Sequence, residues 1–326
     1  MWRLDGSASR CALRAGLLAV ACVLRLGAVA QAPPLNIDEV RYLVVTHHLR
    51  TGLGYDNWSG PETHVHPLHP ILTALVEDGP ESLESRGRAV TLAASVLLLW
   101  PVALLAGRLG GALALDVVLL LGAVHPWLVR AAAAVQPESL YAFVVGCALC
   151  LLLPSGEGAV PARRWWGAGL LFGLSYLARP EGFLVGLLAC AVAFVQGGGR
   201  HAGVRRLAGP ALFLVALALS AAPFLIYLRR TSGQWIVTGK TAHVFFFNQA
   251  LASEDDPWEA WRIYKDLRAR YDSPFSYAAA HPREVLVAAT RSLPRLAFST
   301  LPRSLGPAGL VGCLACAALF LSRAES

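Results

Sequence analysis

Apolar runs separated by short polar stretches are the dominant pattern of this 326-residue chain. These runs lie at about 15–30, 89–107, 111–129, 139–153, 165–178, 181–195, 207–228 and 305–322. A helix that crosses a bilayer needs about 20 residues, so the boundaries of the shorter runs are open. The pattern predicts an all-α membrane protein, a single polytopic domain over residues 1–326 built as a helical bundle of about eight transmembrane helices.

The first apolar run has two interpretations. Its basic start and the small residues Ala28–Ala30 are typical of a cleaved secretory signal peptide. Arg25 within the run is unfavourable for a signal peptide, and we favour a first span that is retained. In both cases residue 31 onward emerges on the non-cytoplasmic side of the membrane.

The polar stretch at 31–88 is the predicted first extracytoplasmic loop. Residues 35–52 predict an amphipathic helix, because Asn36 can cap it and Glu39 three residues later completes a capping-box pattern. This helix is too short and too polar to span, so we place it at the membrane interface. Residues 53–70 read as an ordered loop rich in Gly, Pro and His, and a second short amphipathic piece follows it.

The arginines predict which loops face the cytoplasm, because Lys and Arg favour the inner side of short loops. Counted from a cytoplasmic N-terminus, the inner loops carry Arg108, Arg163, Arg164, Arg200, Arg205 and Arg206. The outer connections are then 31–88, 130–138, 179–180 and 229–304. The last of these is a second large extracytoplasmic segment.

Charged side chains from distant parts of the chain meet at the outer face under this topology. They are Asp38, Glu39, His66, Glu138, Arg179, Glu181 and Lys240. This convergence is the main physical argument for an active site on the extracytoplasmic side. A composition heavy in Ala, Leu, Gly and Arg suits a multi-pass protein of a bacterial cell inner membrane.

Composition narrows the class of protein. The chain is 56% hydrophobic and 15% charged, whereas soluble domains are about 45–50% apolar and about 25% charged. A net charge of +7 fits the positive-inside bias and contacts to anionic lipid or phosphate better than nucleic acid. The pairs Cys147/Cys150 and Cys313/Cys316 lie in apolar runs, where Cys packs as a small hydrophobe, so we expect no zinc site or disulfide framework.

The adjacent acids Asp38 and Glu39 are the first candidates for chemistry. A carboxylate in a partly dry site can take a proton from an acceptor hydroxyl, an effect worth about 10²–10⁴ in rate. A divalent cation held by these acids is a further candidate role. The alternative is that acids in a first helical turn simply favour the helix dipole. Glu39 fits this alternative well as a capping-box partner, and Asp38 fits it less specifically.

Three histidines, His64, His66 and His69, follow among prolines. Histidine is a common metal ligand, but the spacing of a defined site such as HExxH is missing. We therefore favour a proline-fixed turn back to the membrane over a metal cluster. Asn57-Trp58-Ser59 is a glycosylation sequon, which has meaning only in a secretory pathway.

Later outer connections supply three more candidates. Glu138 opens a span after Pro137, where it is either functional or a first-turn acid, two readings of equal weight. In Arg179-Pro180-Glu181 the proline alone explains the break between two apolar runs, so the charges predict a role. The planar fork of Arg179 suits a phosphate, and a simple Arg179–Glu181 pair is the alternative. Lys240 is a weaker second phosphate contact.

Taken in order, these motifs resemble the GT-C type glycosyltransferases. The acidic pair is followed by Tyr42 in a DExxY form, and HPLHP at 66–70 is similar to the family's PPLYP-like return to the membrane. PESLY at 137–141, ARPEG at 178–182 and TSGQWIVTGK at 231–240 also look like family motifs. The resemblance is to the group that uses polyprenyl- or dolichyl-phosphate sugars, which includes protein O-mannosyltransferases and aminoarabinose transferases.

The resemblance implies a GT-C-like bundle and an inverting transfer from a polyprenyl-phosphate-linked sugar to a lipid, glycan or protein acceptor. Asp38 would be the base, supported by Glu39. Substrate-binding roles would fall on Tyr42, His66, Glu138, Arg179, Glu181 and Lys240. Arg179, with Lys240, would neutralise the leaving polyprenyl phosphate. No cofactor is implied apart from a candidate divalent cation, with Asp38 and Glu138 as its candidate ligands.

Two departures and two other functions stand beside this interpretation. Family members usually run longer, and the second position of the family's paired prolines is a histidine-containing variant in this chain. A transporter or flippase for a lipid-linked or anionic substrate is the alternative function, but transporters place polar groups near the midplane, often with internal repeats. A structural or assembly protein is the third.

Overall fold

The computed structural model describes residues 8–77, 82–153, 160–196, 205–253, 256–271 and 273–295. In this part the chain forms thirteen helices and one short antiparallel hairpin. The helices are α1 Ala8–Ala30, α2 Ile37–Thr51, α3 Leu68–Leu75, α4 Leu83–Val124, α5 Pro126–Ala131, α6 Glu138–Leu152, α7 Ala162–Ala178, α8 Glu181–Gln196, α9 Arg205–Ser232, α10 Lys240–Ser253, α11 Pro257–Arg270, α12 Pro274–Ala280 and α13 Pro282–Arg295. The strands are β1 Asp56–Asn57 and β2 Gly60–Pro61. The chain divides into two compact units, Met1–Gly239 and Lys240–Ser326.

Three helices of the described residues, α1, α4 and α9, are long and apolar enough to cross a membrane, and α6 and α8 are shorter apolar helices. The predicted helical class is therefore confirmed, and these helices agree with a membrane protein. The apolar run at 305–322 lies outside the described residues, and the number of about eight spans stays a prediction.

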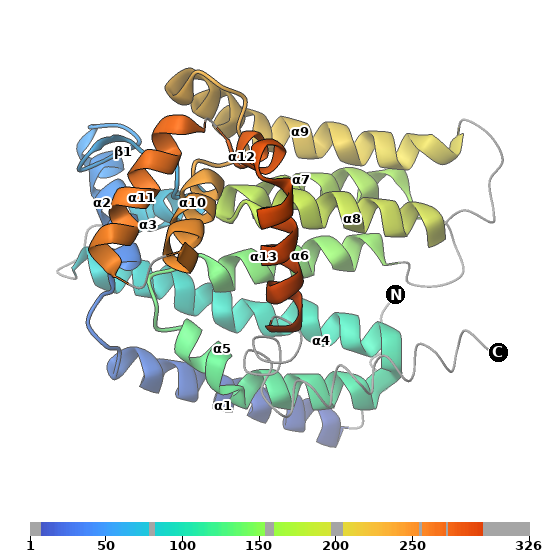
Figure 1. Cartoon of the computed structure of the whole chain (residues 1–326). Coiled ribbons are helices and arrows are strands. Elements are labelled where there is room, and N and C mark those ends of the chain that lie inside the picture. The colour runs from blue at the N-terminus through green and yellow to red at the C-terminus, as the bar shows by residue number, and fades with distance from the viewer. Residues whose placement is uncertain are drawn as a thin grey trace. The chain divides into compact units, whose positions relative to one another are not determined.

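Helix α4 contains two of the predicted apolar runs as its two arms. Gly111 has a φ of +77°, a left-handed conformation that residues with a Cβ rarely adopt, and the chain reverses there. A Cβ on Gly122 would lie 2.8 Å from the side chain of Leu99, so the arms pack closely side by side (Figure 1). The second arm ends at Val124, because Pro126 starts α5 and cannot continue the helix.

Arg25 ties α1 to both arms of α4. The side chain is fully buried and donates to Ser95 Oγ at 2.9 Å, to the Gly122 carbonyl at 2.9 Å and to the Ala123 carbonyl at 3.1 Å. A buried guanidinium is tolerated among apolar side chains only when such acceptors satisfy it. Arg25, which is unusual within an apolar run, thus holds α1 against both arms of α4.

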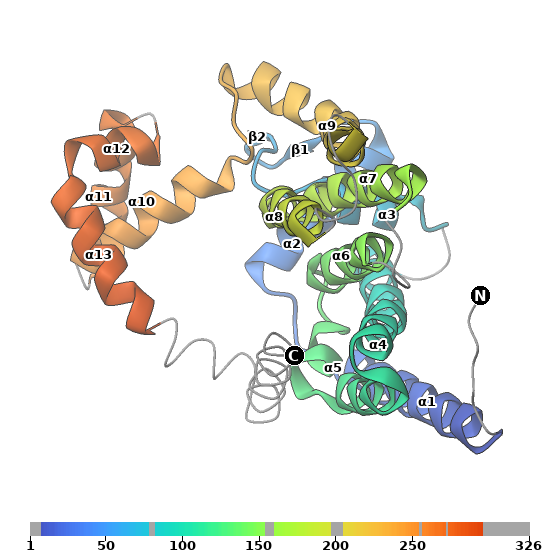
Figure 2. The same ribbon diagram turned by 90° about the vertical axis from the view of Figure 1, so that its right-hand side faces the viewer.

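Helices α6, α7, α8 and α9 complete the bundle of the first unit and are seen nearly end-on in Figure 2. Their shared core includes Trp165, Phe172 and Phe213. A Cβ on Gly169 of α7 would lie 2.3 Å from the Phe213 carbonyl oxygen of α9, so α7 and α9 approach backbone to backbone. Helix α2, the hairpin and α3 lie at one end of this bundle (Figure 1).

The second unit contains α10 to α13 around an aromatic core in which Phe246 and Tyr277 are buried. The Tyr277 hydroxyl donates to Glu284 Oε2 at 2.8 Å and ties α12 to α13. Its boundary, between Gly239 and Lys240, falls inside the predicted outer segment 229–304.

Candidate functional site

Helix α2 begins with the predicted capping box. The side chain of Asn36 accepts from the Glu39 amide at 3.0 Å, and the Asn36 amide donates to Glu39 Oε2 at 2.8 Å. The other carboxylate oxygen of Glu39 accepts from the Val135 amide at 2.9 Å, and the side chain is buried. Both carboxylate oxygens of Glu39 therefore accept hydrogen bonds from backbone amides, which gives this side chain a positioning role.

Residues 132–137 form a strap between α5 and α6 that connects to α2 and α4. Arg88 donates to the Ala133 carbonyl and, at 3.0 Å, to the Pro33 carbonyl. Gly87 leaves room for Val135, since a Cβ there would lie 2.6 Å from Val135 Cγ1. The strap leads directly into Glu138, so these contacts and the one from Glu39 fix the start of α6 relative to α2.

Asp38 and Tyr42 lie one turn apart on α2. Asp38 is exposed, and among the described residues it has no hydrogen-bond or ion-pair partner. Burial raises the pKa of Tyr42, the negative charge of Glu138 raises it further, Arg179 opposes this rise, and Asp38 adds to it. The Tyr42 phenol is therefore neutral and lies within electrostatic range of all three charged groups.

Arg179 bridges two acids at the turn between α7 and α8. It forms an ion pair with Glu138 and donates to both oxygens of Glu181, at 3.1 Å and 3.2 Å. Pro180 stops α7 and puts Glu181 in the first turn of α8. The side chains of Arg179, Glu138 and Glu181 are 27%, 47% and 53% exposed, so an anion from outside can reach the guanidinium. Tyr141 of α6, which sequence reasoning missed, lies within electrostatic range of Arg179 and Glu181.

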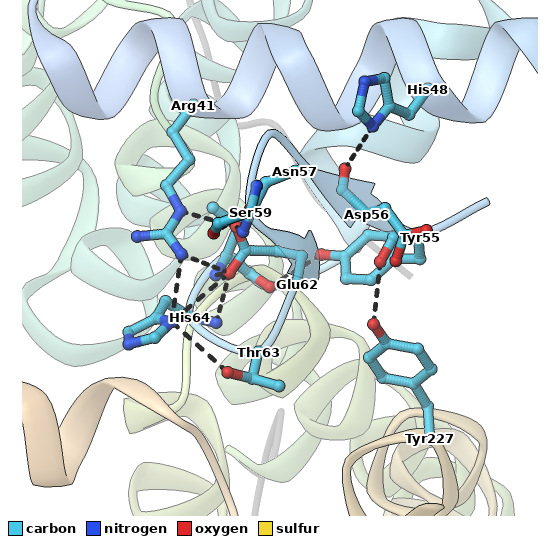
Figure 3. A network of polar contacts seen from close by, with 11 residues as sticks. Arg41, His48, Tyr55, Asp56, Asn57, Ser59, Glu62, Thr63, His64 and Tyr227 are labelled. Carbon is cyan, nitrogen blue, oxygen red and sulfur yellow. Dashed lines mark hydrogen bonds and ion pairs between the residues drawn. The ribbon is translucent and has the colours of Figure 1, made fainter. Parts of the chain in front are cut away.

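A second polar network surrounds Glu62, beside the hairpin (Figure 3). Glu62 is fully buried and accepts from Arg41 at 2.6 Å and 2.9 Å, from Asn57 Nδ2 at 2.8 Å and from the His64 amide at 2.6 Å. Burial alone would raise the pKa of Glu62, but the hydrogen bonds from His64, Arg41 and Asn57 hold it well below its ordinary value. This network also buries Asn57, the acceptor residue of the sequon.

Sequence reasoning missed Glu62 and Arg41, which are 21 residues apart. The signal that could have found them is the short Asp56–Pro61 hairpin, because a tight turn returns the chain toward α2. Fully buried carboxylates are rare unless they are paired, and a buried partner is not visible in residue spacing.

Two of the three predicted histidines, His66 and His69, lie in the protein interior. His66 is 1% exposed, its Nδ1 donates to the Tyr176 carbonyl at 2.6 Å, and its ring packs edge-on against Tyr176 and Phe224. His69 is fully buried, its Nε2 lies 3.0 Å from Thr91 Oγ1, and burial lowers its pKa to about 4. Among the described residues, no group of three or more His, Cys, Asp or Glu side chains is arranged to hold a metal ion.

Lys240 is exposed and is the first residue of the second unit. The residues just before it are held by the first unit. The Gly239 amide donates to the Thr63 carbonyl at 2.9 Å, and the Tyr176 hydroxyl donates to the Val237 carbonyl at 2.7 Å. A Cβ at Gly239 would lie 2.4 Å from Thr63 Oγ1, which explains a glycine at this position.

The structure brings five of the predicted site residues together at one end of the bundle. They are Asp38, Tyr42, Glu138, Arg179 and Glu181. Glu39 supports this group indirectly, through its hydrogen bonds to the backbone of Asn36 and Val135. His66 lies outside the group and packs against Tyr176 and Phe224. Comparison of the chain with family models, curated proteins and solved structures finds no match.

Proposed function

We propose that the protein is an inverting membrane glycosyltransferase that moves a sugar from a polyprenyl-phosphate donor to an acceptor hydroxyl at the extracytoplasmic face. The observation that carries the proposal is the placement of Arg179, held between Glu138 and Glu181, in the same group as the exposed carboxylate of Asp38. An unpaired acid and a reachable guanidinium that both act electrostatically on Tyr42 match a base and an anion site.

Asp38 is the proposed base. Its carboxylate takes the proton of the acceptor hydroxyl while the acceptor oxygen attacks the anomeric carbon from the face opposite the phosphate. The bond from that carbon to the phosphate oxygen breaks, the electron pair leaves with the polyprenyl phosphate, and the configuration inverts. General-base assistance of this kind is worth about 10²–10⁴ in rate.

Arg179 is the proposed contact for the leaving phosphate. Its guanidinium already makes an ion pair with Glu138 and a two-pronged contact with Glu181, so it is pre-oriented. A phosphate that approaches the exposed side exchanges with one of these acids, because the planar fork binds phosphate oxygens as well as carboxylates. Stabilisation of the leaving charge is a large contribution in a site with little water.

The neighbouring Tyr42 then takes a supporting role. Its neutral phenol is a hydrogen-bond donor at the donor sugar or phosphate. We assign His66 to positioning rather than to substrate contact, because the ring is buried against Tyr176 and Phe224. By its burial and carbonyl contact it fixes the start of α3 to the end of α7.

A transporter or flippase is the second candidate function. Polar groups within the candidate spans would favour it, and the described spans contain Arg25 and the Arg14–Asp116 pair. Arg25 is satisfied by Ser95 and backbone carbonyls, and Arg14 and Asp116 satisfy each other at 2.6 Å. These contacts suit helix packing, whereas the half-exposed group around Arg179 suits an enzyme.

The test is transfer of labelled sugar from a polyprenyl-phosphate donor to membrane acceptors, with wild type beside Asp38→Asn at matched amounts of folded protein. We expect Asp38→Asn to lose activity by a factor of about 100 or more, the effect of a missing general base. Glu77→Gln, which changes another exposed carboxylate, is the matched control and should keep activity. Full activity in Asp38→Asn would remove Asp38 as the base, and no transfer by wild type from any donor would favour the transporter or assembly functions.

A further inference from the structure

Helix α11 of the second unit carries two tryptophans and two cations on one face. Trp258, Trp261, Arg262 and Lys265 are spaced at i, i+3, i+4 and i+7, which places them on one side of an α-helix. All four are exposed, with Trp258 79% and Trp261 38% exposed. The Lys265 ammonium lies 5.5 Å from the centre of the Trp261 ring.

The adjoining face of α11 packs within its own unit. Ala260 is fully buried, and the Tyr264 hydroxyl lies 2.8 Å from Nδ1 of His243 on α10. Arg268 lies 5.9 Å from the ring of Phe246 on α10. Trp261 lies at the edge of this packing, because its ring stacks on Tyr264 and lies 6.4 Å from the ring of Phe247 on α10, whereas Trp258 is left on the outside. Burying large aromatic rings is favourable, so a face that exposes two of them predicts an occupant.

The charge of α11 and its short covalent link to the candidate span α9 indicate what covers this face. Helix α11 has four basic side chains, Arg262, Lys265, Arg268 and Arg270, against Glu259 and Asp266. Tryptophan beside Lys and Arg is typical of residues at the headgroup level of a bilayer, where cations attract anionic lipid. The unit follows the candidate span α9 after only residues 233–239, which reach at most about 25 Å.

We propose that the α11 face formed by Trp258, Trp261, Arg262 and Lys265 binds the headgroup layer of a bilayer that contains anionic lipid. The tryptophan rings enter the interface between headgroups and acyl chains, and the cations contact lipid phosphates. This interaction anchors the second unit to the membrane surface and does not depend on the reaction proposed above.

The experiment uses the full chain in nanodiscs, with ordinary or brominated phosphatidylcholine and phosphatidylglycerol. Bromine quenches tryptophan at contact distance. The difference in emission between wild type and a Trp258→Phe/Trp261→Phe variant isolates the two rings. We expect brominated lipid to lower this difference signal at least about twofold, as for rings at the interface, while aqueous acrylamide has little effect.

A second arm tests the cations. In Arg262→Gln/Lys265→Gln the gain in quenching on going from phosphatidylcholine alone to mixed anionic nanodiscs should fall several-fold, because each cation near an anionic surface contributes about fivefold in binding. Arg283→Gln, a change of one exposed cation on α13, is the charge control and should leave the tryptophan signal unchanged.

Two results would overturn the proposal. Quenching of the difference signal by acrylamide but not by brominated lipid would place the face in water, where a soluble acidic partner could reach it. Protection from both quenchers would mean that protein covers the tryptophans. Retained far-ultraviolet circular dichroism in each variant separates loss of binding from loss of folding.

Discussion

Glu62 is a fully buried carboxylate whose negative charge is stabilised by Arg41, Asn57 and the His64 amide. A charge removed from water is costly unless hydrogen bonds and an opposite charge replace the lost solvation. Here both are present, and they connect α2 to the hairpin. At the scale of single residues, this pair orders the loop that leads to His66 and α3.

Replacement of Glu62 by Gln should lower the free energy of unfolding by about 1.5–3 kcal/mol at neutral pH, the usual contribution of hydrogen bonds to a charged group. Because the pKa of Glu62 is lower in the folded protein, its contribution is present above the ordinary value of 4.5 and is lost as pH falls toward the folded value. Unfolding in nanodiscs across acidic and neutral pH measures this. Asp38→Asn is the control, and equal stability of Glu62→Gln and wild type at neutral pH would contradict the prediction.

Glu39 offers a separate test of a positioning role against a catalytic one. Gln can replace Glu in a capping box, whereas Ala cannot. We expect Glu39→Gln to keep most of the stability and transfer activity, and Glu39→Ala to lose about 1–2 kcal/mol of unfolding free energy. Melting temperature and transfer rate, measured on the same preparations, distinguish the roles. If Gln abolishes transfer while stability is unchanged, Glu39 takes part in the reaction.

At the scale of elements, glycines set how closely helices approach and where α4 reverses. The left-handed Gly111 separates the two arms, and Gly169 lets α7 meet the α9 backbone. The arms carry Ser95, Gly122 and Ala123, which accept from Arg25. The turn at Gly111 is therefore coupled to the packing of α1.

Gly111→Ala should destabilise the protein by about 1–2 kcal/mol, the cost of a left-handed conformation for a residue with a Cβ. Gly27→Ala in α1 is the matched control, because Gly27 lies within a helix and a Cβ there meets nothing within 4 Å. That change should be neutral or slightly stabilising. Thermal unfolding of both variants in the same lipid measures the difference in stability. Equal melting temperatures of Gly111→Ala and Gly27→Ala would contradict the prediction of a strained turn.

At the scale of the whole molecule, the bundle of the first unit has a polar group at each end. The Arg179 group and the hairpin lie at one end. At the other, Arg108 and Arg164 both donate to the Cys150 carbonyl at the end of α6. Because α6 runs from Glu138 to Leu152, these two groups are separated by the length of a helix. This arrangement fits the positive-inside topology predicted from the loops.

Cysteine labelling tests the sidedness. In a background without native cysteines, Trp58→Cys on the hairpin and Arg163→Cys at the start of α7 are both exposed positions. A membrane-impermeant maleimide should label Trp58→Cys in intact cells and Arg163→Cys only after lysis. The reverse pattern would place the Arg179 group on the cytoplasmic side and exclude the proposed extracytoplasmic reaction.

Several local features were predictable because they depend on neighbours within one helical turn. The capping box of Asn36 and Glu39 is present, and Gly52 ends α2 in a left-handed conformation with a φ of +76°. The break at Pro180 follows from the missing amide of proline. Residue periodicity likewise gave the apolar helices, although not the merging of two of them across Gly111 into the hairpin-shaped α4.

The burial of side chains and the pairing of charges could not be predicted from neighbours within one helical turn. His66 was predicted to bind substrate, but Tyr176, 110 residues away, places it in an aromatic core. The alternative to a phosphate contact for Arg179 was a pair with Glu181, whereas folding also brings Glu138 to it from 41 residues away. The state of an ionisable group depends on its solvation and on nearby charges, which distant segments supply. The order of polar and apolar residues therefore established the class and the helices, and contacts across the bundle established which side chains face one another.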